Sequence, residues 1–195
     1  ARFNDHVLPI LGRTGCNQGA CHASQFGKGG FKLSIFGFAP ERDVLALTRE
    51  WGGRRLSVFR PRDSLVLRKP TLQVAHGGGR RFATGSYAYD VLRTWIAEGG
   101  RGPAADSPAI TGLDVFPELR TLKVGQVQQL RVEARYSDGS KRDVTRRTRF
   151  DSLDEGVAGV AGDGQVTVRG HGQAAIMIRY RGRTAVSLML SPLDS

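Results

Sequence analysis

The spacing of the apolar residues changes near residue 103, and this change limits what the chain can fold into. Before it, apolar residues recur every three or four positions in several segments, as on one face of a helix. After it, apolar and polar residues alternate in short runs between turns, as in strands. Residues 103–109, PAADSPA, have the composition of a linker. We therefore predict a mainly helical domain at 1–102 and an all-β domain at 110–195.

The first half is predicted to contain three helices joined by long, glycine-rich loops. Pro40 suits a first helical position because its φ is fixed, and Glu41 and Asp43 suit the positive end of the helix dipole. Loops of this length in a small helical domain usually wrap around something. The helices are expected at about residues 3–12, 40–51 and 87–98.

The second half is predicted to be a sandwich of short strands. Apolar residues alternate with polar ones in 128–136, and Asp138 and Gly139 then supply a hairpin turn. Short strands at regular spacing with turns between them are typical of a β-sandwich. Further strands are expected at 165–169, 174–180 and 184–190.

The chain is strongly basic, with 29 Lys and Arg against 18 Asp and Glu and a formal charge of +11. Such a charge favours acidic partners. The cations are scattered, and no stacking aromatic residues accompany the longest basic stretch at 141–149, so nucleic-acid binding is not expected. No apolar run approaches the roughly 18 residues of a membrane span. Because the sequence begins with Ala, we expect a removed leader and a longer native chain with further domains.

Two cysteines and a histidine stand close together in residues 15–24, GCNQGACHAS. Cys16 and Cys21 are the only cysteines, and His22 follows directly. One interpretation is a disulfide, and a second is a Cys2His2 zinc site completed by His76. A third is covalent haem, although the usual C-x-x-C-H motif has two residues between the cysteines rather than four. A disulfide does not explain the adjacent histidine, and zinc does not explain the long glycine-rich loops.

The order of motifs in the first half resembles the cytochrome c domains found at the start of large exported planctomycete proteins. The shared motifs are CxxxxCH, SLVLRKPT at 64–71 and AYDVLRTWIAEGG at 88–100, and the match runs from Phe3 to about Gly100. The four-residue spacing between the cysteines is a feature of that group. The resemblance implies a small helical cytochrome c-like domain in a periplasmic or cell-surface protein, acting as an electron-transfer module and not as an enzyme.

The same resemblance implies one haem c, attached through thioethers at Cys16 and Cys21 and ligated by His22 as the proximal ligand. We predict His76 as the sixth ligand, because it lies in a downstream loop where related small cytochromes carry methionine. The three glycines after His76 let the backbone approach the macrocycle edge. A bis-His iron is expected to be six-coordinate and low-spin, with a lower potential than His/Met ligation gives.

The sequence also indicates roles for side chains outside the cysteine and histidine motif. Arg80, Arg81 and Lys69 are predicted to pair with the haem propionates. The two methionines, Met177 and Met189, lie in strand patterns of the second half, where core packing is expected. His6 is expected to face solvent and His171 to have no role, while Trp95 and Phe31 are expected to pack against the cofactor or the core.

Residues 111–190 resemble the bacterial Ig-like domain of group 2. The matching features are YSDGS and the DVT after it, then the DGQVTV turn and strand and the strand GQAAIMIRY. The resemblance implies a spacer or interaction module. With no catalytic constellation in the sequence, three alternatives to electron transfer remain. They are a haem-based sensor or ligand binder, a peroxidase-like enzyme, and a haem-free adhesion module with a Cys16–Cys21 disulfide.

Overall fold

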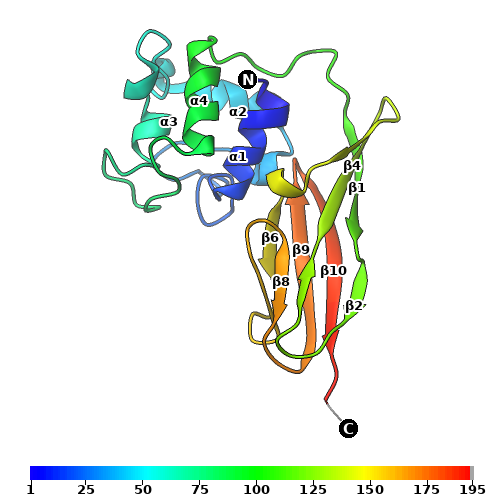
Figure 1. Cartoon of the computed structure of the whole chain (residues 1–195). Helices are drawn as coiled ribbons and strands as arrows, with labels where there is room; N and C mark the ends of the chain where they lie inside the picture. The colour runs from blue at the N-terminus through cyan, green and yellow to red at the C-terminus, as the bar shows by residue number, and fades with distance from the viewer. Residues whose placement is uncertain (194–195) are drawn as a thin grey trace. The chain divides into compact units, whose positions relative to one another are not determined.

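A computed structural model of the chain describes residues 1–193, and the chain divides into two compact units (Figure 1). The helical unit is Ala1–Ser107 and the β unit is Pro108–Ser195. Each unit has its own buried apolar core. The predicted combination of a helical part and an all-β part is confirmed, whereas residues 194 and 195 of the predicted β domain lie outside the described residues.

The helices of the helical unit are short, and long irregular segments separate them. The first predicted helix begins with a π-helical turn, and the second is followed by a 3-10 turn. No helix among residues 1–193 is long and apolar enough to cross a membrane. The elements are η1 (Phe3–Val7), α1 (Leu8–Arg13), η2 (Ile35–Gly37), α2 (Pro40–Thr48), η3 (Glu50–Gly53), η4 (Pro61–Asp63), α3 (Leu65–Arg68) and α4 (Tyr87–Ala97).

Helix α4 forms the centre of the helical core. Its N-cap is Ser86, whose hydroxyl accepts a hydrogen bond from a first-turn amide. The apolar stripe predicted for this helix is buried, and Trp95 is only 1 % exposed. The Trp95 ring packs 5.5 Å from that of Phe3, and its indole N–H donates to Arg101 O at 2.8 Å. The helix ends before Gly99, whose φ of +94° lets the chain reverse.

Asp43 lies in the first turn of α2, as the sequence predicts, and its side chain is buried. The carboxylate accepts hydrogen bonds from the Ser34 amide at 2.5 Å and from the Ser34 hydroxyl at 2.6 Å. The Ser34 hydroxyl in turn accepts from the amide of Ala39, the residue before α2. Asp43 therefore ties the segment before η2 to the start of α2.

We expect the substitution Asp43→Asn to remove a pH dependence from the stability of the helical unit. Burial raises the pKa of Asp43 above its ordinary value, against the lowering effect of the hydrogen bonds from Ser34. The stabilising contribution of a group with a raised folded-state pKa is fully present below its unfolded pKa of about 3.9 and is lost as the pH rises through the folded value. In urea unfolding, the free energy of unfolding of the wild type minus that of Asp43→Asn should therefore fall between about pH 4 and pH 7. The control is Glu41→Gln, exposed in the same turn, and a relative free energy that rises with pH would contradict the assignment.

The β unit contains three sheets, with strand orders β1-β4-β5, β2-β10-β9-β6 and β3-β8-β7. The antiparallel hairpin of β9 and β10 is its longest feature, and β2 pairs with β10 in parallel (Figure 1). The strands are β1 (Ile110–Phe116), β2 (Leu119–Thr121), β3 (Val127–Gln129), β4 (Arg131–Tyr136), β5 (Lys141–Asp143), β6 (Arg149–Ser152), β7 (Ala158–Val160), β8 (Gln165–Val168), β9 (Gly172–Tyr180) and β10 (Arg183–Ser191), with a 3-10 turn η5 (Thr145–Arg147) before β6.

Alternation along the strands builds the β core. In β9, Ile176 and Ile178 are fully buried, and Met189 of β10 is 1 % exposed, which confirms its predicted core role. Met177 lies between the two isoleucines and therefore points to the other face of β9, where it is half-buried. The prediction that Met177 also packs in the core is wrong, because neighbouring residues of a strand face opposite sides.

Several outer strands of the sheets are short or charged, although the outer strand β1 has seven residues. Strand β5 consists of Lys141–Asp143 and β2 has three exposed residues. On β6, Asp151 accepts from Arg149 at 2.6 Å and from Arg179 of the neighbouring β9 at 2.5 Å. Charge of this kind on an outer strand interferes with pairing to another chain.

Candidate functional site

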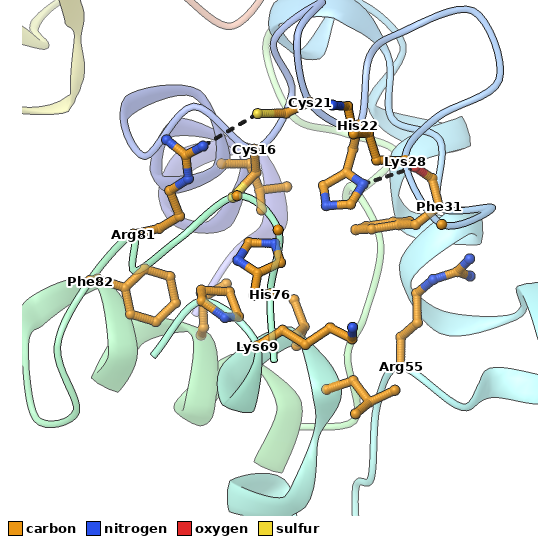
Figure 2. Close-up of a pocket in the computed structure, with 18 of the residues that line it drawn as sticks. Cys16, Cys21, His22, Lys28, Phe31, Arg55, Lys69, His76, Arg81 and Phe82 are labelled. Atoms are coloured by element: carbon orange, nitrogen blue, oxygen red, sulfur yellow. Dashed lines mark hydrogen bonds between the residues drawn. The ribbon is translucent and has the colours of Figure 1, made fainter. Parts of the chain in front are cut away.

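A pocket of about 740 Å³ in the helical unit brings together the residues that the sequence singled out (Figure 2). Cys16, Cys21 and His22 line it from the segment after α1, and His76 lines it from the segment between α3 and α4. The volume lies within the range of about 300 to 1,000 Å³ that is usual for small-molecule and cofactor sites. Much of the remaining wall is apolar, from Leu11, Leu65, Val66, Pro70, Phe82 and Leu92.

His22 is held in place by hydrogen bonds on both its backbone and its ring. Its amide donates to Cys16 O at 3.0 Å, and its carbonyl accepts from the Leu33 amide at 2.8 Å. The ring nitrogen Nδ1 lies 3.1 Å from Phe31 O, and because a carbonyl can only accept, Nδ1 carries the proton. The Phe31 ring also packs against the imidazole at 4.5 Å between centroids. His22 therefore presents an unprotonated Nε2 in its neutral form.

Gly27 makes the position of the Phe31 carbonyl possible. Its φ is +68°, and a Cβ at this residue would lie 2.2 Å from Phe31 O, the acceptor of the His22 proton. Only glycine allows the two backbone segments to approach so closely without displacement.

His76, like His22, directs its Nδ1 to a backbone carbonyl, and in this case the carbonyl belongs to the same turn. Its Nδ1 lies 2.8 Å from Gly79 O, and the Gly79 amide donates to His76 O at 2.9 Å. The neutral ring again presents Nε2. Gly78 leaves room beside it, because a Cβ there would come within 2.9 Å of His76 Cε1 and the ring would have to shift.

The two imidazoles face each other across the pocket (Figure 2). The ring centroids of His22 and His76 are 6.2 Å apart, and the ring planes differ by 16°. In an imidazole bound to a metal ion, the bond from metal to nitrogen is about 2 Å and the ring centre lies about 1.1 Å beyond that nitrogen. Two imidazoles on opposite sides of one ion would therefore have ring centroids about 6.3 Å apart. Hydrogen bonds from the other ring nitrogen to backbone carbonyls are the usual support of metal-ligating histidines. The centroid separation of this near-parallel, stacked pair therefore matches that of two imidazoles on a single metal ion.

The electrostatics of the pocket favour a neutral His22 imidazole and an anionic ligand. Burial lowers the pKa of His22, and the nearby His76 lowers it further, against the hydrogen bond to Phe31, so the ring is neutral at pH 7. Among the described residues, no aspartate or glutamate lines the pocket. A cluster of cations without carboxylates attracts negatively charged groups. The cations are Lys28, Arg54, Arg55, Lys69 and Arg81.

Both thiols are free, so the structure does not form the disulfide considered from the sequence. Cys16 is 9 % exposed, and burial raises the pKa of its thiol even though Thr14 Oγ1 lies 3.3 Å from its Sγ. Cys21 is half-buried and its Sγ lies 3.4 Å from Nη2 of Arg81. Nowhere in residues 1–193 do three or more His, Cys, Asp or Glu side chains form a group that could hold a metal ion, so the Cys2His2 set considered from the sequence is not assembled in this structure.

The predicted cationic residues divide into two groups. Arg81 and Lys69 line the pocket as expected, whereas Arg80 is exposed and lies outside the pocket lining. His6 is half-buried instead of facing solvent, with its Nδ1 accepting from the Arg2 amide. His171 is exposed and bonded to Pro192 O at 2.9 Å.

Sequence reasoning missed the role of Arg55. Its guanidinium lies 4.5 Å from the Phe31 ring centroid and donates to Gly30 O at 2.9 Å and to Ala46 O at 2.7 Å. Arg55 thereby joins the segment that holds Phe31 to helix α2. The only signal in the sequence was its position after the paired Gly52 and Gly53, which ended the predicted helix.

Comparison with protein families identifies the β unit. Residues 109–178 match the bacterial Ig-like domain of group 2, which confirms the resemblance noted for the second half. No curated protein matches the chain.

Three solved structures illustrate what the chain is similar to. The S-layer protein SbsC, domains 4 and 5, is 15 % identical with a TM-score of 0.39, over 45 % of this chain and 54 % of that one. The surface layer protein SbsC, domains 1–6, is 16 % identical with a TM-score of 0.39, over 46 % of this chain and 14 % of that one. An EHEC intimin mutant is 20 % identical with a TM-score of 0.29, over 45 % of this chain and 47 % of that one. The chain thus covers about half or less of each of these structures.

Proposed function

We propose that the helical unit serves in electron transfer with one haem c, which Cys16 and Cys21 would hold covalently and His22 and His76 would hold through the iron. The observation that carries the proposal is the pair of imidazoles 6.2 Å apart, each with its Nδ1 proton directed to a backbone carbonyl. Both cysteines line the same pocket. When bound, the haem would supply an iron that alternates between the ferric and ferrous states.

The side chains of the pocket would hold this group and set its properties. The carbonyls of Phe31 and Gly79 fix the tautomers of the two histidines and so keep Nε2 available. Lys69, Arg81 and the other pocket cations suit the carboxylates of an anionic macrocycle. The apolar wall limits access of water. Two imidazole ligands favour a lower potential than imidazole with thioether.

We propose further that the chain works in the periplasm or at the cell surface, with an acidic redox partner. Residues 1–107 contain sixteen Lys and Arg and eight Asp and Glu, so the helical unit, which contains the pocket, carries most of the net positive charge. Electron-transfer rates with an acidic donor protein should therefore fall as salt is added, because exposed charges are screened. Rates that do not change with salt would exclude an electrostatically steered partner.

The family match supports a second candidate function, which is an interaction or spacer role at the cell surface without haem. Its basis is the group 2 Ig-like domain at residues 109–178. Under this alternative, the pocket of the helical unit would hold no macrocycle and the purified chain would be colourless. The Ig-like fold by itself is compatible with both candidates.

The deciding experiment is an absorption spectrum of the chain produced in a host that matures c-type cytochromes. Spectra are recorded oxidised, dithionite-reduced and in alkaline pyridine, for the wild type, His76→Ala and the control His6→Ala. We expect haem that stays attached after denaturation and a change from low-spin to high-spin in His76→Ala alone. A colourless protein, or haem removed by denaturation, would reject covalent attachment and leave the interaction role.

A further inference from the structure

The two histidines of the pocket are anchored unequally. His22 makes three hydrogen bonds, one to Cys16 O in its own segment and two to the segment of residues 31–33, through Phe31 O and the Leu33 amide. Phe31 also covers its ring and is itself held under Arg55. Removing His22 from the pocket would break several interactions that belong to the core of the unit.

His76 is anchored mainly to its own turn. Both of its hydrogen bonds, from Nδ1 to Gly79 O and from the Gly79 amide to His76 O, stay within residues 76–79. Within the described part of the chain, the one hydrogen bond that ties residues 75–80 to another segment runs from Lys69 Nζ to Ala75 O, at 3.3 Å and exposed to solvent. The histidine and its turn can therefore move as one piece.

The ends of this loop are closed by backbone hydrogen bonds. The Val74 amide donates to Arg68 O at 3.2 Å, and the Arg81 amide donates to Pro70 O at 2.8 Å. Opening of residues 75–80 consequently leaves α3 and the segment leading to α4 in place. Segments with few bonds to their surroundings open at low free-energy cost.

We propose that His76 is an exchangeable ligand, carried by the loop of residues 75–80 and latched by Lys69. When the loop opens, the place left by the His76 imidazole would become free for a small ligand with a donor lone pair, such as carbon monoxide or imidazole. The inference rests on the proposed haem site, and it adds a ligand-binding activity to the electron-transfer role. The cationic, partly apolar pocket would also admit a small anion such as cyanide.

The test measures carbon monoxide binding to the reduced holoprotein in the wild type, Lys69→Gln and Lys32→Gln. Lys69 bonds to the loop, whereas Lys32 is exposed and is not among the residues that line the pocket, so Lys32→Gln controls for loss of a lysine charge from the helical unit. Carbon monoxide should bind the wild type slowly, and Lys69→Gln should raise the apparent affinity roughly threefold to tenfold, as expected for loss of one exposed hydrogen bond. Lys32→Gln should leave the affinity unchanged, and His76→Ala should bind fastest.

Hydrogen–deuterium exchange supplies a readout that does not depend on ligand binding. We expect the amides of residues 75–80 to exchange faster than those of residues 16–33, and faster still in Lys69→Gln. Holoprotein that binds no carbon monoxide, or an equal response in the two lysine variants, would overturn this inference while leaving the haem assignment intact. Protein without haem would instead overturn the proposed function and this inference together.

Discussion

Trp95→Ala is expected to lower the free energy of unfolding of the helical unit by about 3 to 5 kcal/mol, as is usual for removal of a buried aromatic side chain. Trp95 is 1 % exposed, packs against Phe3 and donates its indole proton to Arg101 O. The substitution leaves a cavity in the core and removes the donor that satisfies this carbonyl. Urea unfolding followed by far-UV circular dichroism measures the loss.

Trp51→Ala is the matched control, since the chain has two tryptophans and both lie in the helical unit. Trp51 is 68 % exposed, so its loss should change the free energy by less than about 1 kcal/mol. The transition of the β unit, whose core is separate, should stay in place in both variants. Equal effects of the two substitutions would contradict the burial of Trp95.

Gly27→Ala is expected to destabilise the helical unit by about 2 to 4 kcal/mol, through strain at a left-handed position and displacement of backbone. The added Cβ would lie 2.2 Å from Phe31 O and 2.8 Å from Lys32 Cα, both in backbone that cannot rotate away. Because Phe31 O accepts the His22 proton, the same change should disturb the orientation of that imidazole. Denaturant unfolding gives the first effect, and the spin state of the holoprotein gives the second.

Gly29→Ala separates conformational strain from collision. Gly29 has a φ of +63°, close to the +68° of Gly27, but an added Cβ meets nothing within 4 Å. Its cost should therefore be limited to the left-handed conformation, about 1 kcal/mol. If Gly27→Ala were no more destabilising than Gly29→Ala, the close approach of residue 27 to Phe31 would be disproved.

Periodicity was sufficient to predict the longest regular elements, but not the short helix α3 or the strands β1, β2, β5, β6 and β7. The apolar stripe of residues 87–98 became α4, and the alternating second half became the Ig-like unit that the family match confirms. The same rule, applied residue by residue, would have separated Met177 from Met189, because Met177 lies between two buried isoleucines of one strand. The wrong prediction for Met177 arose because the alternation was applied to the strand as a whole and not to each of its residues.

The supports of the candidate site could not be predicted, because they depend on the path of loops. The proton of His22 goes to a carbonyl nine residues away, which Gly27 brings near by its left-handed conformation. Asp43 is likewise a buried residue whose partner, Ser34, lies in a segment without apolar periodicity, so the sequence does not predict this contact. The adjacent Arg80 and Arg81 look alike in sequence, and only the backbone decides which one reaches the pocket. Haem ligation by His22 and His76 stays a prediction until a spectrum tests it.

The short strand β5 and the charged strand β6 oppose association between copies of the β unit through their strand edges. A concentrated protein meets many copies of itself, and an open strand edge then allows one sheet to extend into the next. Strand β5 is only Lys141–Asp143, and on β6 the carboxylate of Asp151 is shared by Arg149 and Arg179. A second copy approaching these edges would have to desolvate charges before any backbone bond could form. Such units can therefore be packed densely, or repeated along one polypeptide, and still remain separate folded bodies.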